Sequence, residues 1–313
     1  MTRTTAIVVT YQSADVVGRC LDACIAAGID AIVVDNASRD GSAGEAAKRN
    51  VRVIANKENR GFASAVNQGV AEASTEFILL LNPDAVIVTG IGLLEAACRR
   101  PGIAAAAGKL VDEDGRWQRG FSIRRFPTAA ALCFEVLGIN RLWPSNPANL
   151  RYRYLDRDEN NAGPVEQPAG AFLLVRRDNW NSVGGMDERF YPVWFEDVDF
   201  CKRLVESGHG IEYVPAAVAT HKGAHSANQL GTSDRQRLWY GSLLRYAALH
   251  LPRRTQALVA GAVAVGGVSR LVMGICKTVS LEPAAVYGKV IRLALHSLCL
   301  GSGGTAELIR QKK

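Results

Sequence analysis

The chain lacks three patterns that would each identify a common class of protein. Its seven cysteines include no CxxC pair and are odd in number, so we expect buried free thiols rather than a zinc site or a disulfide framework. No G-x-G-x-x-G turn follows the first strand-like run, where the chain reads Thr10-Tyr11-Gln12-Ser13, and this excludes a dinucleotide-binding oxidoreductase. No apolar leader of the signal-peptide type precedes that run, so we expect a cytoplasmic protein.

Acidic residues are scarce in the last quarter of the chain. From residue 235 onward there are twelve Lys and Arg but two acidic residues, which gives this part a charge of +10 and leaves −3 for the rest. A basic, apolar tail beside a nearly neutral body suggests an anionic surface as a partner. The bases alternate with aliphatic rather than aromatic side chains, which favours lipid, and we expect no nucleic-acid partner.

The same region has no long uninterrupted hydrophobic run. Residues 256–268 are almost wholly small and apolar, but Arg270 follows, so the run is shorter than the roughly 18–20 residues that a membrane span needs. A second apolar face follows over residues 290–298. One interpretation is a pair of interfacial helices on anionic lipid, with the protein peripheral at the inner face of the cytoplasmic membrane. The other is a basic helical subdomain that packs on the body.

The body of the chain alternates strand and helix patterns. Short apolar runs at residues 6–10, 31–34, 51–54 and 77–81 are separated by helical spacing, which predicts βαβ units and a mostly parallel sheet. We therefore expect an α/β domain over residues 1–228 and a helical extension over residues 229–313. Ligands of such sheets bind beyond the carboxyl ends of the strands. Several polar residues end strand-like runs there: Thr10, Tyr11, Asp35, Asn36, Asn82 and Asp84.

Two groups of carboxylates carry the chemistry. Asn82-Pro83-Asp84 ends an apolar strand with two oxygen-bearing side chains, which suits Mg²⁺ or Mn²⁺ shared with a substrate diphosphate. The alternative is an ordinary Asn-Pro-Asp turn. Glu196, Asp197 and Asp199 begin a helix, where the macrodipole explains one acid but not three among aromatic neighbours. A carboxylate in partly apolar surroundings can be tuned as a general base.

Three further sites point to a nucleotide diphosphate. Asp35 ends a strand and can accept hydrogen bonds from a nucleobase edge, whereas residues 38–42 are explained by turn and N-cap chemistry. Arg60-Gly61 opens a helix, a place that suits an anion. His221 and His225 bracket a lysine and a glycine, and one of them can complete a metal shell or bind phosphate, although a lone histidine is usually structural.

Taken in order, these motifs resemble the family 2 inverting glycosyltransferases with the GT-A fold, especially the bacterial rhamnosyltransferase-like branch. The resemblance covers about residues 5–226. It rests on Thr10-Tyr11, Asp35-Asn36, Asn59-Arg60-Gly61, Asn82-Pro83-Asp84, Gln167-Pro168-Ala169-Gly170-Ala171 and Phe195-Glu196-Asp197-Val198-Asp199.

The resemblance implies a role for each site residue. Asp84 would bind the metal and His221 would sit near it, with Asn82 where the family's DxD motif has its first Asp. Asp197 and Glu196 would be the catalytic acids: Asp197 would deprotonate the acceptor hydroxyl, and Glu196 would assist on the acceptor side, where Gly170 would also lie. The remaining residues would bind the nucleotide sugar: Thr10, Tyr11, Asp35, Asn36, Arg60, Gly61 and Asn82.

The implied reaction is a single displacement with inversion at the anomeric carbon. The donor would be a nucleoside-diphosphate sugar, first dTDP-rhamnose and next a UDP-sugar. The acceptor would be a glycan or a saccharide on a polyprenyl diphosphate, in cell-wall, O-antigen or exopolysaccharide assembly. The alternative is a non-catalytic glycan-binding or scaffold protein on a degenerate transferase fold, which the asparagine at position 82 keeps open.

Overall fold

The computed structural model describes residues 3–223, 231–278 and 281–300. They fall into two compact units. The sheet unit comprises Met1–Phe126, Arg153–Glu188 and Glu196–Ser226. The helical unit comprises Pro127–Tyr152, Arg189–Phe195 and Ala227–Lys313. The last boundary lies close to the expected start of the extension at residue 229, and two earlier segments join the helical unit as well.

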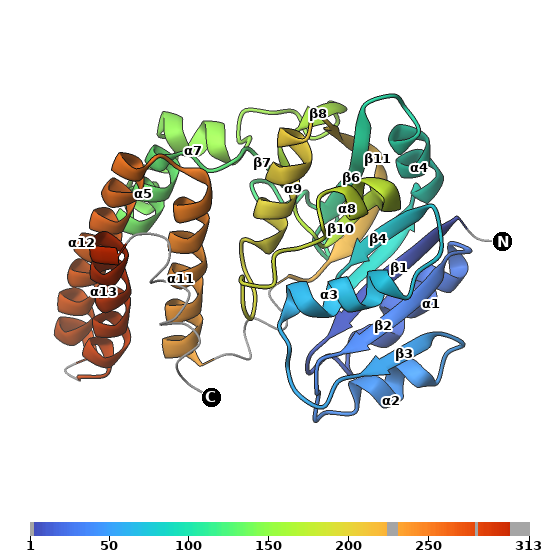
Figure 1. The fold of residues 1–313 in the computed structure, drawn as a ribbon, viewed down its shortest axis with the longest axis horizontal. Coiled ribbons are helices and arrows are strands. Elements are labelled where there is room, and N and C mark those ends of the chain that lie inside the picture. The colour runs from blue at the N-terminus through green and yellow to red at the C-terminus, as the bar shows by residue number, and fades with distance from the viewer. Residues whose placement is uncertain (1–2, 224–230, 279–280, 301–313) are drawn as a thin grey trace. The chain divides into compact units, whose positions relative to one another are not determined.

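A nine-stranded sheet forms the centre of the sheet unit, in the order β3-β2-β1-β4-β10-β6-β11-β5, with β8 paired to β11 (Figure 1). A separate two-stranded ribbon pairs β7 (Ile123–Arg124) with β9 (Gln167–Pro168). The strands of the large sheet are β1 (Thr4–Thr10), β2 (Asp30–Asp35), β3 (Arg52–Ala55), β4 (Phe77–Leu81), β5 (Ala85–Thr89), β6 (Ile103–Val111), β8 (Gly163–Val165), β10 (Phe172–Arg176) and β11 (Gly210–His221).

Helices cover both faces of this sheet, which explains why its central strands are apolar throughout. On β1 the side chains of Ala6 and Val8 join one core cluster, and those of Ile7 and Val9 join the other. All seven residues of β1 are buried, as expected for a strand between two helical layers. The helices of this unit are α1 (Val17–Ala26), α2 (Ser42–Ala47), α3 (Phe62–Ala71), α4 (Ile91–Cys98), α8 (Arg177–Ser182) and α9 (Glu196–Glu206).

Strand directions bring distant segments to one edge of the sheet. β1 runs parallel to β2 and β4, with Thr10 opposite Asp35. β10 runs antiparallel to β4 and β6, so it starts where β4 ends. β11 is parallel to β6, and antiparallel β5 starts beside its end, with His221 opposite Ala85. The predicted α/β architecture with a mostly parallel sheet is confirmed.

The helical unit contains α5 (Ala129–Leu137), α6 (Ile139–Leu142), α7 (Pro147–Tyr152), α11 (Thr232–His250), α12 (Arg253–Thr278) and α13 (Glu282–Leu300). The hydroxyl of Thr128 caps α5 by accepting a hydrogen bond from the Ala131 N–H at 3.3 Å. The guanidinium of Arg270 on α12 donates to the Val136 carbonyl near the end of α5. A Cβ at Gly266 would lie 2.2 Å from that carbonyl oxygen, so glycine permits the close approach of the two helices.

Two sequence expectations about this unit need correction. Cys276 and Cys299 are exposed, although the other five cysteines are buried free thiols as expected. Among the described residues, 253–277 form one helix that is long and apolar enough to cross a membrane by length and composition, with mean hydropathy 1.9. The uninterrupted apolar run before Arg270 therefore underestimates the length of the apolar helix. The helix continues past Arg270 and remains apolar on average.

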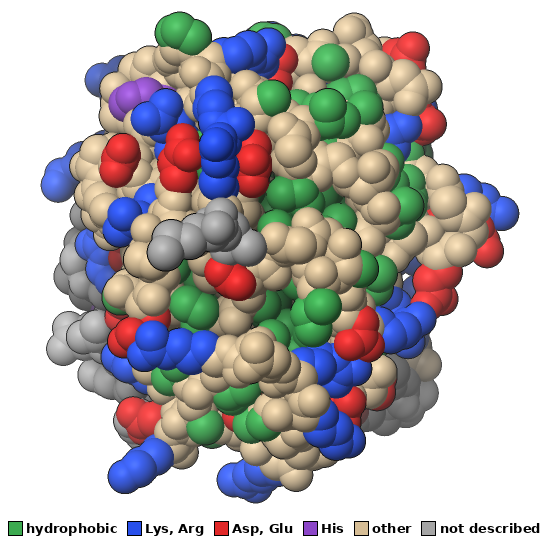
Figure 2. All heavy atoms as spheres, turned by 90° about the vertical axis from the view of Figure 1, so that its right-hand side faces the viewer, with side chains coloured by type: hydrophobic (Ala, Val, Ile, Leu, Met, Phe, Trp, Pro, Cys, Tyr) green, Lys and Arg blue, Asp and Glu red, His purple; other side chains and the backbone are tan. Residues whose placement is uncertain are grey.

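Charged side chains of both signs are interspersed over the face of the molecule drawn in Figure 2. Exposed or half-buried ion pairs of the sheet unit include Arg52 with Glu72 and Arg99 with Glu95. Exposed pairs of this kind contribute little to stability, typically about 0–1 kcal/mol each. The sheet unit is therefore held together mainly by its two apolar cores.

Candidate active site

The loops after β1 and β2 are organised by the carboxylate of Asp35. Its Oδ1 accepts a hydrogen bond from the Thr10 hydroxyl at 2.8 Å, and its Oδ2 accepts one from the Ser38 N–H at 3.0 Å. These bonds are the partners that a buried carboxylate at a strand end requires. Each oxygen keeps a second lone pair that can accept from a ligand. The nucleobase role of Asp35 stays a prediction, and the structure adds a role in shaping the turn.

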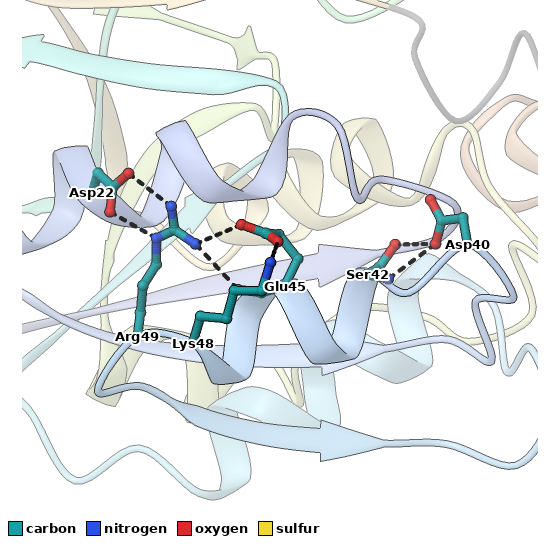
Figure 3. A network of polar contacts seen from close by, with 6 residues as sticks. All are labelled: Asp22, Asp40, Ser42, Glu45, Lys48 and Arg49. Atoms are coloured by element: carbon teal, nitrogen blue, oxygen red, sulfur yellow. Dashed lines mark hydrogen bonds and ion pairs between the residues drawn. The ribbon is translucent and has the colours of Figure 1, made fainter.

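The same two loops are joined by side-chain to backbone hydrogen bonds. Gln12 accepts from the Arg39 N–H at 2.7 Å. Asp40 accepts from the Ala14 N–H at 2.9 Å and from the Ser42 hydroxyl at 2.5 Å (Figure 3). Burial raises the pKa of the Asp40 carboxyl, but these hydrogen bonds lower it more, so its pKa lies below the ordinary value. These hydrogen bonds join the loop after β1 to the loop after β2 at the edge of the sheet.

A guanidinium clamp holds the helices behind these loops. Arg49 donates to both carboxylate oxygens of Asp22 on α1, at 2.7 and 2.8 Å, and to Glu45 on α2 at 3.0 Å (Figure 3). A bidentate pair of this kind fixes orientation as well as distance. The hydrogen bond from Arg49 lowers the pKa of the Asp22 carboxyl. The clamp therefore supports the geometry of the loop pair from outside.

Asn36 links β2 to the start of α3. Its Nδ2 donates to the Gly61 carbonyl at 3.0 Å, and its Oδ1 accepts from the Arg60 N–H at 3.3 Å and from Asn56. Gly61 has φ of 85°, a conformation that favours glycine. Arg60 is exposed, and Tyr11 is half-buried beside the buried Thr10. All the predicted nucleotide-sugar residues except Asn82 thus lie at the ends of β1 and β2 and at the start of α3.

A second cluster forms where β4, β5 and β11 meet. His221 Nε2 lies 3.2 Å from Asn82 Nδ2 and 3.4 Å from Asp84 Oδ1. The other oxygen of Asp84 accepts a hydrogen bond from the Gly223 N–H at 2.9 Å. Asp84 is buried, and the hydrogen bond from the Gly223 N–H offsets part of the cost of burying its carboxylate. The structure therefore brings the predicted Asn82, Asp84 and His221 together, while His225 lies outside the described residues.

These donors suit a hard divalent cation. Within residues 3–223, 231–278 and 281–300 no group of three or more His, Cys, Asp or Glu converges on one point. Asp84 and His221 supply an ionised carboxylate and an imidazole, and Mg²⁺-type sites often use only one or two carboxylates plus substrate phosphates. The residues present therefore fit a cation that takes its remaining ligands from a diphosphate.

Sequence reasoning missed Gln118 and Phe121, which surround the histidine. Gln118 Nε2 donates to the His221 carbonyl at 2.6 Å, and its Oε1 lies 2.9 Å from His221 Nδ1. The Phe121 ring stacks on the imidazole with centroids 5.3 Å apart and planes at 12°. Both residues come from the irregular segment after β6, and no local pattern links them to a histidine a hundred residues later.

Asp197 occupies the first turn of α9, facing the β9–β10 turn. Its Oδ2 lies 3.3 Å from the Gly170 N–H and 3.4 Å from Gln167 Nε2. Burial raises the pKa of Asp197, partly offset by the Gly170 hydrogen bond and the positive charge of Arg124. Pairing of β7 with β9 brings Arg124 and Gln167 to this acid. Gly170 therefore lies against Asp197, and its place on the acceptor side stays a prediction.

The neighbouring acids differ from Asp197. Asp199 forms an ion pair with Arg203 at 2.8 Å, and Arg203 also donates to the Val183 and Gly185 carbonyls. Asp199 is therefore part of the packing of α9 onto the loop after α8. Glu196 is buried at the first position of α9, and its role on the acceptor side stays a prediction.

Comparisons with known proteins identify the family of this chain. The sequence profile of glycosyl transferase family 2 matches residues 5–164, and that of the N-terminal domain of galactosyltransferase matches residues 160–226. This chain belongs to glycosyl transferase family 2 and is a glycosyltransferase of the rhamnosyltransferase-like type.

Two curated relatives have rhamnosyltransferase names. The N-acetylglucosaminyl-diphospho-decaprenol L-rhamnosyltransferase of Mycobacterium tuberculosis is 32% identical over 216 residues, which cover 64% of this chain and 69% of that protein. The rhamnosyltransferase WbbL of Escherichia coli is 29% identical over 189 residues, covering 58% of this chain and 66% of WbbL.

Solved structures share the fold at low sequence identity. GalNAc-T7 with UDP, GalNAc and Mn²⁺ has a TM-score of 0.56 and 12% identity, over 79% of this chain but only 48% of GalNAc-T7. The mannosyltransferase PcManGT of Pyrobaculum calidifontis, with GDP-Man and Mn²⁺, has a TM-score of 0.54 and 18% identity, over 98% of this chain and 85% of its own. The expected GT-A fold is confirmed.

Proposed function

We propose that this glycosyltransferase moves L-rhamnose from dTDP-rhamnose to a saccharide carried on a polyprenyl diphosphate, with inversion at the anomeric carbon. The observation that carries the proposal is the convergence, at one edge of the sheet, of the Asp84–His221 pair with the loop edge around Asp35. The choice of sugar and acceptor is supported by the relatives whose names state rhamnosyl transfer, one of them to a decaprenyl-diphosphate-linked sugar. Such a reaction belongs to cell-wall or surface-polysaccharide assembly.

Asp197 is the group that receives the proton of the acceptor hydroxyl. Its carboxylate sits at a helix start beside the Gly170 N–H and Gln167, and burial raises its pKa. A base whose pKa is raised toward the working pH is a stronger proton acceptor while it remains ionised. Glu196 and Gly170 border the same position and contact the acceptor.

The donor binds across the ends of β1, β2 and β4. Asp35 accepts hydrogen bonds from the base, and Thr10 and Asn36 hold the loops that surround it. Tyr11, Arg60, Gly61 and Asn82 complete the nucleotide-sugar side. Asp84 and His221 would hold a divalent cation, which would supply positive charge to the departing nucleoside diphosphate.

The first experiment measures thermal stability with Mn²⁺ plus dTDP, UDP or GDP, for the wild type and for Asp84→Ala. A ligand that binds only the folded state raises the melting temperature by mass action. We expect a Mn²⁺-dependent rise with dTDP that Asp84→Ala loses, followed by transfer of labelled rhamnose to N-acetylglucosaminyl-diphospho-polyprenol. A rise with UDP or GDP alone would refute dTDP-rhamnose as the donor. No rise with any nucleotide would favour a non-catalytic scaffold instead.

We also propose that α12 rests on an anionic membrane surface, where a polyprenyl acceptor is anchored. Its exposed apolar residues recur at spacings of seven, three, four and one, which place them on one helical face. They are Leu258, Val265, Val268, Val272 and Met273. Exposed basic residues flank this stripe, Arg253 and Arg254 before it and Lys277 after it.

A helix with one face buried suits the membrane surface better than a span. Val259, Ala260 and Val263 of α12 are buried within the protein. Only the opposite side of this helix can therefore face lipid. Co-sedimentation of the full chain with phosphatidylglycerol vesicles and with phosphatidylcholine vesicles tests the proposal. We expect binding to the anionic vesicles only, and equally weak binding to both would overturn it.

A further inference from the structure

Both ring nitrogens and the carbonyl oxygen of the buried His221 have defined neighbours in the sheet unit. Its carbonyl oxygen and Nδ1 both contact the amide of Gln118, at 2.6 and 2.9 Å. Its Nε2 lies 3.2 Å from Asn82 Nδ2 and 3.4 Å from Asp84 Oδ1. The Phe121 ring stacks on the imidazole and holds its plane.

The backbone carbonyl determines which way the Gln118 amide points. A carbonyl oxygen only accepts hydrogen bonds, so the Gln118 atom at 2.6 Å must be the NH₂ group. The Gln118 oxygen therefore faces His221 Nδ1 and must accept. It follows that Nδ1 carries a proton. The reversed amide would place two acceptor oxygens in contact with no hydrogen between them.

A protonated Nδ1 leaves the lone pair of the neutral ring on Nε2. This lone pair points toward Asn82 and Asp84, and the NH₂ group of Asn82 can donate to it. The opposite tautomer would carry its proton on Nε2, donate to Asp84, and offer no lone pair to a cation. An amide at position 82 is compatible with the first tautomer, whereas a carboxylate there would favour a proton on Nε2.

We propose that Gln118 is a positioning residue that fixes the Nδ1–H tautomer of His221 and so keeps Nε2 available as a cation ligand. The inference about cation binding rests on the proposed function, but the tautomer itself does not. Partners that orient a ligating histidine through its second nitrogen typically change metal affinity about 10- to 100-fold when they are removed.

The test uses the full chain labelled with ¹⁵N-histidine. Long-range ¹H–¹⁵N spectra distinguish protonated from unprotonated ring nitrogens, and His221→Asn assigns the signal. We expect a protonated Nδ1 and an unprotonated Nε2 in the wild type. We expect Gln118→Leu to shift the ring toward Nε2–H, because it removes the acceptor for Nδ1–H. We expect Asn82→Asp to shift it in the same direction, because a carboxylate at position 82 would accept a hydrogen bond from Nε2–H. A wild-type ring that carries a proton on Nε2 at neutral pH, alone or together with one on Nδ1, would overturn the proposal whatever the variants do.

Mn²⁺ titration in the presence of dTDP gives the second readout. We expect Gln118→Leu to weaken Mn²⁺ binding about 10- to 100-fold. Gln256→Leu is the matched control, because its amide also donates to backbone carbonyls, those of Ala248 and Leu251, within the helical unit. Unchanged tautomer and affinity in a folded Gln118→Leu would refute the proposal. The expected tautomer in a wild type that binds neither Mn²⁺ nor dTDP would refute the proposed function and leave the role of Gln118 standing.

Discussion

Replacing Asp197 with asparagine should remove activity and stabilise the protein. Burial raises the pKa of this carboxyl above its ordinary value of 3.8, so the folded state disfavours the ionised form. Asparagine keeps the shape and can still accept the Gly170 hydrogen bond, but it cannot take a proton from an acceptor hydroxyl. The two effects of one substitution therefore have opposite directions.

The gain in stability of Asp197→Asn depends on pH because folding is coupled to proton binding by Asp197. Between pH 3.8 and the raised folded pKa, the folded state binds more protons than the unfolded state, so the free energy of unfolding falls as pH rises. Above that window the wild type carries the full cost of the buried charge, and Asp197→Asn does not. The melting temperature of the variant should exceed that of the wild type at neutral pH, and the difference should shrink as the pH approaches 4.

The expected loss of activity equals the rate enhancement that a positioned general base contributes. General-base catalysis contributes about 10²–10⁴-fold, which corresponds to about 2.7–5.4 kcal/mol of activation free energy. The assay is release of nucleoside diphosphate at saturating donor and acceptor, so that kcat is measured apart from KM. A variant that keeps more than about a tenth of wild-type kcat, or that is less stable than the wild type at neutral pH, would refute the assignment of Asp197.

Asp199 is the matched control two residues away. Asp199→Asn removes the charge that pairs with Arg203, so it should lower the free energy of unfolding by about 1.5–3 kcal/mol. It should keep most of the turnover at temperatures where the protein is folded. Opposite signs for the two variants in urea unfolding would separate the base from the structural acid.

Three further outcomes are expected. Gly69→Ala should destabilise by about 1–3 kcal/mol in urea unfolding, because its Cβ would lie 2.7 Å from Ile7 Cγ2, whereas Gly44→Ala, with open space around it, should stabilise by about 0.5–1 kcal/mol. Asp40→Ala should lower stability by about 1 kcal/mol and raise the donor KM while kcat changes little, since it disconnects the loop pair. Val265→Asp should weaken sedimentation with anionic vesicles by at least about tenfold, while Val88→Asp, at a valine of equal exposure (60% against 59%), should leave it unchanged. Equal effects of the two members of either pair would contradict the reasoning.

The strands and the edge they define could be predicted from the sequence. Both faces of the sheet are covered, so β1 and β4 are continuous apolar runs, and polar residues at their ends stand out. The rule that ligands bind beyond carboxyl ends then placed Asp35 and Asp84 at one edge, as the structure has them. Their roles in binding stay predictions.

Other parts of the site depend on contacts that leave no local pattern. Gln118 contacts His221 across 103 positions of sequence, and its amide looks like any loop residue until that partner is known. Asp197 differs from Asp199 through its contacts with Gly170 and Gln167, about thirty positions away in the sequence. The assignment of residues 127–152 to the helical unit follows from packing of α5 against α12, which no periodicity in either segment predicts.

The two units are interwoven along the chain, which crosses between them five times. A single recombination event could not transfer the helical unit from one enzyme to another, because α5 and the helices that cover it are encoded far apart. Gly266 and Arg270 would have to be inherited together with the segment that carries Val136. A chain cut at residue 228 would leave α5 without the cover that α12 provides.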